Sequence, residues 1–468
     1  MSGPRMTING QVLPADSSFG VVNPATEGEF SRAPECSRKQ LDAAMDAATR
    51  AVQLWRADDA ARVAGLNAVA DAVDEHASEL ADLLTAEQGK PLGAAHYEVS
   101  ETTRWLRAAA ALELPIETIL DDGSARAELR RRPIGVVAAI TPWNFPLLLA
   151  GWKLGPALRA GNTVVLKPSP YTPLATLRLG EIVNQVLPPG VINVVSGGDH
   201  LGAWMTSHPA VGKVSFTGSV ATGKKVMASA ADGLKRLTLE LGGNDAAIVL
   251  DDANPEAIGR GLFWGGFINC GQICAGIKRI FVPEALHDDV VDVLAERARR
   301  VRVGPGTQEG VQMGPIQNHP QFERVRGLVA EALSDGASAA AGGAPLDGPG
   351  YFFPPTVLTG ANEGMRIVDE EQFGPAIPVL TYRTLDEAVE RANATPFGLS
   401  GSVWGSDLDR ATEVAARLDT GTAFVNDHLA LDPCLPFGGS KQSGLGVENG
   451  PWGLDEFTQL QVVHRPAA

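Results

Sequence analysis

The residue types that could do covalent chemistry in this sequence are a thiol, a carboxylate and a carboxamide. Cys274 lies in the segment FINCGQICAG (267–276), where Gly271 and Gln272 provide a flexible, polar approach to it. A thiol reacts only as the thiolate, and backbone amides in such a segment stabilise the anion. The apolar run 258–268 has helical spacing and would bring the thiol to the edge of a cleft. We predict that Cys274 is a nucleophile; the alternative is a buried packing residue.

The carboxylate and the amide come from two other segments. Glu240 lies in LTLELGG (237–243), whose alternation predicts a strand that ends at two glycines. A carboxylate in an apolar row has a raised pKa, which suits a general base near neutral pH. Asn144, in TPWNFP (141–146), follows an apolar strand and offers the neutral donor that an oxyanion requires. The alternatives are a solvent-facing edge charge for Glu240 and a turn residue for Asn144.

A repeated strand-and-helix pattern between residues 134 and 250 must position these groups. It predicts a parallel, doubly wound sheet that binds ligands at its strand ends. The apolar runs are 134–140, 163–167, 191–195, 213–218, 236–241 and 246–250, and the helical patterns are 146–160, 173–187, 200–207 and 219–231.

The usual Gly-x-Gly-x-x-Gly dinucleotide motif is missing from this pattern. Gly218 and Ser219 instead precede Gly223 at a strand-to-helix junction, where free amides and the helix dipole can bind a pyrophosphate. A plain turn is the alternative. Lys167, at the end of its strand, offers an amine for ribose hydroxyls or an adenosine phosphate.

Outside this region the patterns are mixed. Residues 8–30 predict an edge ribbon, and 115–133 predict a hairpin with an Asp-Gly turn at 122–123. Beyond residue 250 a second α/β unit is expected, and the Gly- and Pro-rich segments 304–318 and 341–355 predict surface loops. Helices are predicted at 41–55, 63–83, 94–111, 255–268, 284–302, 319–335, 384–393 and 407–418, and strands at 279–282, 377–381, 401–404 and 421–426.

Composition limits the classes of function. The chain has 468 residues, is 44% hydrophobic and carries a formal net charge of -16, which opposes binding to nucleic acid or an acidic membrane. No apolar run is long enough to span a membrane and no secretory leader is recognisable, so we expect a cytoplasmic protein. Four cysteines are too few for a disulfide scaffold, and Cys270-x3-Cys274 is a poor zinc site, so no metal is predicted.

Several segments, in order and spacing, resemble the NAD(P)-dependent aldehyde dehydrogenase superfamily. The resemblance extends from about Asn9 to the C-terminus. The segments are PWNFP (142–146), LKPS (166–169), FTGS (216–219), LTLELGG (237–243), FINCGQIC (267–274), EEQFGP (370–375) and PFGGSKQSG (436–444).

The resemblance implies a fold and a domain organisation. The expected fold is α/β, with a Rossmann-type parallel-sheet cofactor domain, a second α/β catalytic domain and a β oligomerisation arm. The cofactor domain would comprise residues 1–114 and 134–243, the catalytic domain residues 244–435, and the arm residues 115–133 and 454–468, which implies a homodimer or homotetramer. A protruding hairpin with exposed edges is best used by pairing with another subunit.

The resemblance also implies a reaction. Cys274 would attack an aldehyde, with Asn144 and the Cys274 backbone N–H holding the oxyanion; hydride transfer to the nicotinamide leaves a thioester, which Glu240 hydrolyses through water. Lys153 and Glu448 match a proton path from the base, although a surface lysine and a solvated loop carboxylate are the alternatives. The implied cofactor contacts are Ile140, Thr141, Trp143, Asn144, Lys167, Ser169, Gly198, Gly202, Phe216, Gly218, Ser219, Leu241, Gly242, Glu371 and Phe373.

One departure from the family pattern concerns the cofactor. Family members often carry a Glu three residues after the lysine at 167, where it accepts both ribose hydroxyls and repels a 2'-phosphate. Here that residue is Pro170, so discrimination against NADP should be weaker. No Arg or second Lys occupies 168–171 to bind the extra phosphate, so we expect NAD, with NADP also possible.

The implied substrate tunnel is apolar. It contains no Arg or Lys to pair with an anionic substrate, so an aliphatic, aromatic or cationic aldehyde fits better. The positions are Phe145, Leu149, Trp152, Ile268, Ile273 and Leu431.

Two other classes of function remain at this stage. A thiol acyl hydrolase would use Cys274 and Glu240 and leave Gly218, Lys167 and Glu371 without a role. A catalytically silent structural relative is opposed by the intact Cys, Glu and Asn. A CoA-acylating enzyme is disfavoured because it needs no hydrolytic base, and Cys270 is expected to be a small buried packing residue rather than a regulatory thiol.

Overall fold

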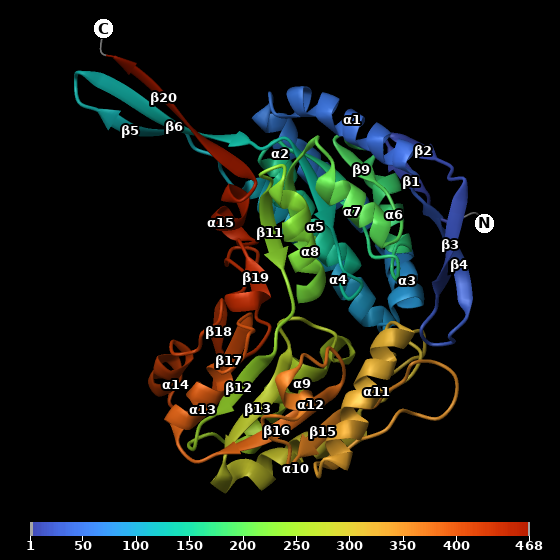
Figure 1. The fold of residues 1–468 in the computed structure, drawn as a ribbon, viewed down its shortest axis with the longest axis vertical. Coiled ribbons are helices and arrows are strands. Elements are labelled where there is room, and N and C mark those ends of the chain that lie inside the picture. Colours follow the sequence, from blue (N-terminus) through green and yellow to red (C-terminus); the bar gives the residue numbers. More distant parts are fainter. Residues whose placement is uncertain (1–2, 467–468) are drawn as a thin grey trace.

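Two mixed, mainly parallel β-sheets lie one above the other in Figure 1, and a thin three-stranded ribbon projects from the upper one. The computed structural model describes residues 3–466. Residues 1–2 and 467–468, which the predicted cofactor domain and arm include, lie outside the described residues. The α/β architecture agrees with the expected fold class.

The upper sheet has eight strands in the order β19-β11-β10-β7-β8-β9-β1-β2. Its central strands are parallel and buried on both faces, which explains their continuous apolar sequences. These strands are β7 (Val136–Ile140), β8 (Thr163–Lys167), β9 (Ile192–Val194), β10 (Val211–Thr217) and β11 (Arg236–Glu240), and the antiparallel edges are β1 (Met6–Ile8), β2 (Gln11–Leu13) and β19 (Gly444–Leu445).

Eight helices accompany this sheet. Ser37 begins the first with a reciprocal capping box to Gln40, as its position ahead of the apolar stripe predicts. The predicted helix 63–83 is wrong, because the chain breaks at His76 into two helices. The helices are α1 (Arg38–Trp55), α2 (Asp59–Glu75), α3 (Ala77–Gln88), α4 (Leu92–Ala111), α5 (Pro146–Arg159), α6 (Leu174–Val183), α7 (Asp199–Ser207) and α8 (Val220–Ala231).

The N-terminal ribbon predicted at residues 8–30 is divided between two different sheets. β1 and β2 join the upper sheet, whereas β3 (Ser17–Val22) and β4 (Glu29–Glu35) form a separate two-stranded sheet.

The lower sheet has seven strands in the order β14-β15-β16-β13-β12-β17-β18. The run 246–250, which the sequence places in the first sheet, lies here instead, because β12 pairs with β13 and β17. β14 and β15 were not predicted. The strands are β12 (Asp245–Val249), β13 (Ile277–Pro283), β14 (Ser338–Ala341), β15 (Thr356–Thr359), β16 (Ala376–Tyr382), β17 (Ser400–Trp404) and β18 (Thr422–Val425).

Helices of the second half cover this lower sheet (Figure 1). They are α9 (Pro255–Phe267), α10 (His287–Arg300), α11 (His319–Ser334), α12 (Arg366–Asp369), α13 (Leu385–Asn393) and α14 (Leu408–Ala415), with short 3-10 turns η1 (Ile268–Gly271), η2 (Glu284–Leu286) and η3 (Lys441–Ser443). α15 (Gly450–Asp455) leads back to the ribbon.

The ribbon consists of β5 (Glu117–Asp121), β6 (Ala125–Pro133) and β20 (Thr458–Pro466). β5 and β6 form the predicted hairpin, and β20 pairs antiparallel with β6 along its whole length. Every residue of β5 is exposed. Across residues 3–466, the helices are too short or too polar to cross a membrane.

Candidate active site

The chain reaches Cys274 through a strained turn. After α9 ends, Asn269, Cys270 and Gly271 all have left-handed backbone angles, with φ of 52°, 61° and 68°. Such angles cost about 1–3 kcal/mol for a non-glycine residue and persist only where surrounding contacts impose them. Here the Gln272 Nε2 donates to the Asn269 carbonyl at 2.9 Å. The turn presents Cys274 as a partly exposed thiol between η1 and β13, close to the position that the sequence predicts.

Buried side chains fix the backbone on both sides of the thiol. The Lys278 Nζ donates to the carbonyls of Ile273, at 2.5 Å, and Gly276, at 2.9 Å. His428 Nε2 lies 2.7 Å from the Ala275 carbonyl. Lys278 and His428 were not predicted from the sequence, because each binds the backbone rather than the reactive thiol. The lysine within the apolar strand β13 was a signal that could have indicated Lys278.

Asn144 is linked to the same turn. Its Nδ2 donates to the carbonyl of Gln272 at 2.9 Å, and its side chain is buried. A carboxamide nitrogen has two hydrogens, so the second one is available to another acceptor. This places an amide donor in contact with the backbone two residues before the thiol, as an oxyanion site requires.

An unpredicted buried ion pair holds the segment of Asn144. The Lys90 Nζ lies 2.5 Å from the Glu98 Oε2 and donates to the backbone carbonyl of Asn144 at 3.0 Å. The other oxygen of Glu98 accepts from the Leu147 N–H at 2.9 Å, at the start of α5. Glu98 lies on the apolar face of α4. A carboxylate on such a face indicates a buried, paired charge, so this position could have been recognised in the sequence.

Glu240 ends β11 and is buried, with neither carboxylate oxygen hydrogen-bonded among the described residues. Burial raises its pKa well above the usual range, the charge of Glu448 raises it further and the ammonium of Lys153 opposes both. Lys153 and Glu448 are fully buried and 2.7 Å apart, which excludes the solvated alternatives for both. The base candidate and the two predicted relay residues therefore form one cluster.

The protonation of Cys274 differs from the simplest expectation. Burial is the main cause that raises its pKa to about 12, and the nearby charge of Glu371 adds to it, while Lys278 acts in the opposite direction. The polar segment predicted to stabilise the anion therefore does not do so by itself, because the thiol also packs against an apolar cluster.

That cluster contains most of the predicted substrate positions. Phe145, Leu149, Trp152 and Leu431 pack together with Cys274. Leu149, Trp152 and Lys153 share one face of α5, so the same helix presents the apolar wall and the ammonium group. Ile273 is buried next to the thiol in sequence, whereas Ile268 is 41% exposed at the end of α9 and lies outside the cluster.

A separate pocket of about 520 Å³ lies at the carboxyl ends of β7, β8 and β10. Its size is that of an ordinary ligand site. Predicted cofactor positions that line it are Ile140, Thr141, Trp143, Lys167, Ser169, Gly202, Phe216, Gly218 and Ser219. Asn144, Gly198, Leu241, Gly242, Glu371 and Phe373 do not line this pocket; Gly198 immediately precedes its lining residue Asp199.

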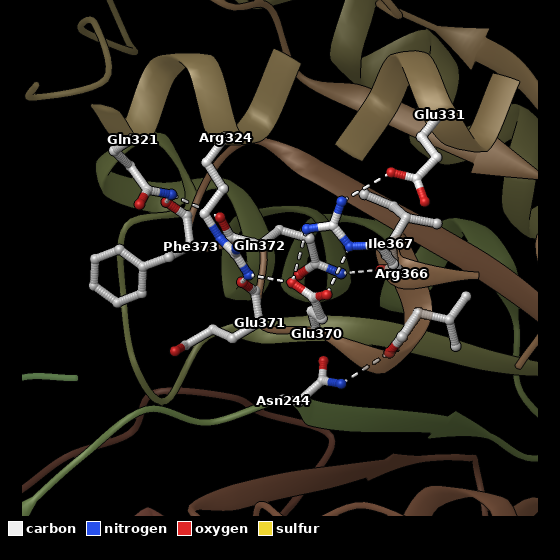
Figure 2. Close-up of polar contacts among 11 residues, drawn as sticks. Asn244, Gln321, Arg324, Glu331, Arg366, Ile367, Glu370, Glu371, Gln372 and Phe373 are labelled. Atoms are coloured by element: carbon white, nitrogen blue, oxygen red, sulfur yellow. Dashed lines mark hydrogen bonds and ion pairs between the residues drawn. The ribbon is translucent and has the colours of Figure 1, made fainter. Parts of the chain in front are cut away.

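Glu371 and Phe373 are placed by the segment between α12 and β16 (Figure 2). The Glu371 Oε1 accepts from the Gly243 N–H at 3.0 Å, beside Gly242, and burial raises the pKa of Glu371 to about 7. Phe373 packs edge-on against Trp143, with ring centroids 5.1 Å apart, and so touches the wall of the cofactor pocket.

α11 fixes this segment through two residues that sequence analysis missed. The Gln321 Nε2 donates to the carbonyls of Gln372, at 2.7 Å, and Phe373, at 3.0 Å. Arg324 donates to the carbonyl of Glu371 at 3.0 Å and to the carboxylate of Glu370 at 2.8 Å (Figure 2).

Comparisons with known proteins agree with this geometry. The model of the aldehyde dehydrogenase family matches residues 12–463. Phenylacetaldehyde dehydrogenase of Pseudomonas fluorescens is 38% identical over 476 residues, which cover 97% of this chain and 94% of that protein. The structure of an aldehyde dehydrogenase from Bacillus cereus in complex with NAD+ is 37% identical, with a TM-score of 0.97 over 100% of this chain and 97% of that one.

A betaine aldehyde dehydrogenase from Staphylococcus aureus, also solved with NAD+, is 33% identical with a TM-score of 0.96, over 100% of this chain and 95% of that one. The predicted family resemblance, fold class and enzyme class are thereby confirmed. The chain belongs to the aldehyde dehydrogenase family, the NAD(P)-dependent oxidoreductases that oxidise aldehydes to carboxylic acids.

Proposed function

We propose that this chain oxidises an apolar, aromatic or cationic aldehyde to its carboxylic acid with NAD, using Cys274 as nucleophile, Asn144 as oxyanion donor and Glu240 as general base. The observation that carries the proposal is the convergence of the three residues. Asn144 donates to the loop of Cys274, and the carboxylate of Glu240 lies close enough to raise the pKa of the thiol.

The chain's own residues act in two stages. The partly exposed Cys274 thiol first loses its proton to solvent. The thiolate then attacks the carbonyl carbon, and the free hydrogen of the Asn144 amide stabilises the oxygen that becomes negative. After oxidation a thioester remains on Cys274. Glu240, whose raised pKa makes it an effective base near neutral pH, takes a proton from water, and the resulting hydroxide hydrolyses the thioester.

The pocket at the carboxyl ends of β7, β8 and β10 fits a dinucleotide. A Cβ on Gly202 would meet open space, and Ser219 caps α8, whose N-terminal amides favour a pyrophosphate. Lys167 is buried beside the pocket, and burial lowers its pKa to about 8. When bound, the nicotinamide supplies the hydride acceptor. We assign Leu241, Gly242, Glu371 and Phe373 to the nicotinamide end, where Phe373 contacts Trp143.

Replacing Pro170 should change the choice of cofactor. Pro170 lines the pocket near Lys167 and contributes no carboxylate. Pro170→Glu adds an acceptor for ribose hydroxyls and a charge that repels a 2'-phosphate. We expect the ratio of kcat/KM for NAD to that for NADP to rise at least about 10-fold, equivalent to about 1.4 kcal/mol. Pro170→Gln is the neutral control, and an equal rise with this variant would contradict the electrostatic argument.

The substrate class follows from the apolar cluster at Cys274. Trp152 packs against Trp105, with ring centroids 5.6 Å apart, and against Phe437 at 5.4 Å. The nearby ammonium group of Lys90 is engaged by Glu98, so it is not free to bind a substrate carboxylate. Aromatic walls can also hold a quaternary ammonium group.

A panel of aldehydes tests this class and the reaction together. We expect phenylacetaldehyde or betaine aldehyde to exceed succinic semialdehyde in kcat/KM by at least about 10²-fold, because an unpaired carboxylate would be desolvated against the apolar cluster at Cys274. The measurement is the absorbance of reduced cofactor with NAD and with NADP in parallel. A preference for the semialdehyde would contradict the substrate class, and no reduction with any aldehyde would favour a thiol acyl hydrolase.

The remaining assignments concern assembly and location. Residues 1–114 and 134–243 are proposed as the cofactor domain, 244–435 as the catalytic domain, and 115–133 with 454–468 as the arm of a homodimer or homotetramer. Ile119, Leu120, Leu460 and Val462 leave apolar side chains exposed on the arm, as a strand awaiting a partner subunit would. A cytoplasmic location is consistent with the few cysteines.

A further inference from the structure

A polar row crosses the sheet between β10 and β11. The strands are parallel, with Ser215 opposite Thr238 and Thr217 opposite Glu240. Because side chains alternate along a strand, Lys213 and Ser215 share one face of β10, and Thr238 and Glu240 share one face of β11. Lys213, Ser215 and Thr238 have no exposed surface. Buried polar groups of this kind are costly unless they are linked to one another.

The outer end of the row reaches solvent. The Lys213 Nζ donates to the Thr238 Oγ1 at 2.7 Å, and the Thr238 Oγ1 donates to the Glu456 Oε2 at 3.4 Å. Lys213 also lies 3.4 Å from the same oxygen of Glu456, whose side chain is 33% exposed. Glu456 directly follows α15, the helix that Figure 1 shows between β19 and the arm strand β20. The three groups therefore form a directed chain from a buried ammonium to a surface carboxylate.

The inner end of the row meets the buried cluster of the active site. The Ser215 Oγ donates to the Glu448 Oε1 at 3.4 Å, the oxygen that also accepts from Lys153. Lys213 precedes Ser215 by two residues on the same face of β10, so the two side chains are neighbours along the row. Burial lowers the pKa of Lys213 to about 8; the carboxylates of Glu456 and Glu448 oppose this shift and Lys153 reinforces it.

We propose that Lys213, Thr238 and Glu456 form the exit by which the proton of the hydrolytic water leaves the active site. The inference rests on the proposed function, in which Glu240 takes that proton. The proton then passes to the Glu448 and Lys153 pair. Lys213 gives a proton to the Thr238 hydroxyl, which gives its own to Glu456 and bulk water. The neutral Lys213 then takes up the proton of the Glu448 and Lys153 pair through a water that the proposal places between them. No electrons are exchanged, and each group returns to its starting state.

The test separates thioester formation from its hydrolysis. Lys213→Met keeps the length of the side chain and removes the ammonium, and Glu456→Gln changes only an accessible group, so the second variant should fold even if the first does not. With NAD and phenylacetaldehyde, the pre-steady-state burst of reduced cofactor should match wild type in both variants. The steady-state rate should fall about 10-fold in Lys213→Met and by a smaller factor in Glu456→Gln.

Two readouts distinguish a proton path from a structural ion pair. Added imidazole should restore the steady-state rate of Glu456→Gln, and the double variant should be no slower than Lys213→Met alone, because both act on one path. Glu413→Gln, a remote exposed carboxylate on α14, is the control and should match wild type. Unchanged steady-state rates in Glu456→Gln, or losses that imidazole does not restore, would overturn the exit. The absence of a burst in wild type would instead contradict the proposed function.

Discussion

Cys274→Ala is expected to abolish aldehyde oxidation, lowering kcat/KM by at least about 10⁴-fold, because it removes the thiol of the apolar cluster that forms the covalent intermediate. The packing change is small, since the thiol already sits at the partly exposed edge of the cluster. Binding of NAD should therefore survive, and quenching of tryptophan fluorescence measures it separately from turnover.

Cysteines elsewhere in the chain provide matched controls for this variant. Cys270 is four residues earlier, fully buried, and its thiol has a pKa raised by burial. Cys270→Ala should retain turnover.

Cys434 is exposed. In a Cys434→Ala background, iodoacetamide should label one thiol per subunit, and NAD with aldehyde should protect it. Full activity of Cys274→Ala would remove the nucleophile from the account.

Glu240→Gln is expected to stop the reaction at the thioester. The amide fills the same space but cannot take a proton from water, so the burst of reduced cofactor should remain while steady-state turnover falls by about 10²- to 10⁴-fold. Stopped-flow absorbance measures both phases in one experiment. Equal steady-state rates for the variant and wild type would contradict the assignment of the base.

The pH dependence gives this variant a second readout. A base must be ionised to act, and burial with Glu448 nearby raises the pKa of Glu240. The hydrolytic rate of wild type should therefore be low below that pKa and rise as pH increases through it. The rise should be absent in Glu240→Gln. Glu456→Gln, which leaves Glu240 in place, should retain it.

The proposed reactive positions could be selected from the sequence because each is a polar residue at the end of an apolar segment. Parallel strands place their carboxyl ends at one edge of a sheet, and both Asn144, after β7, and Glu240, at the end of β11, lie at such an end. The contact of Asn144 with the Gln272 carbonyl joins two distant segments and was not predicted. Family resemblance, rather than periodicity, supplied the positions of Lys153 and Glu448.

Other features depend on contacts that the local sequence does not record. Lys90 and Asn144 are 54 residues apart, and only the folded chain shows that one holds the backbone of the other. The alternating pattern of predicted strands and helices continues past Gly242 and Gly243. It therefore does not show that the chain leaves the upper sheet at these glycines and enters the lower sheet. The buried hydrogen bond of Lys213 was not predicted, because a single lysine in an apolar strand is as typical of an exposed sheet edge as of a buried polar row.

The central claim is that the acyl group is carried by Cys274 after the cofactor has been reduced. Mass spectrometry of Glu240→Gln, quenched after mixing with NAD and phenylacetaldehyde, tests it most directly. The account predicts one phenylacetyl group per subunit on the peptide that contains Cys274, formed together with one equivalent of reduced cofactor. Reduced cofactor without an acylated Cys274, or acylation at another residue, would contradict it.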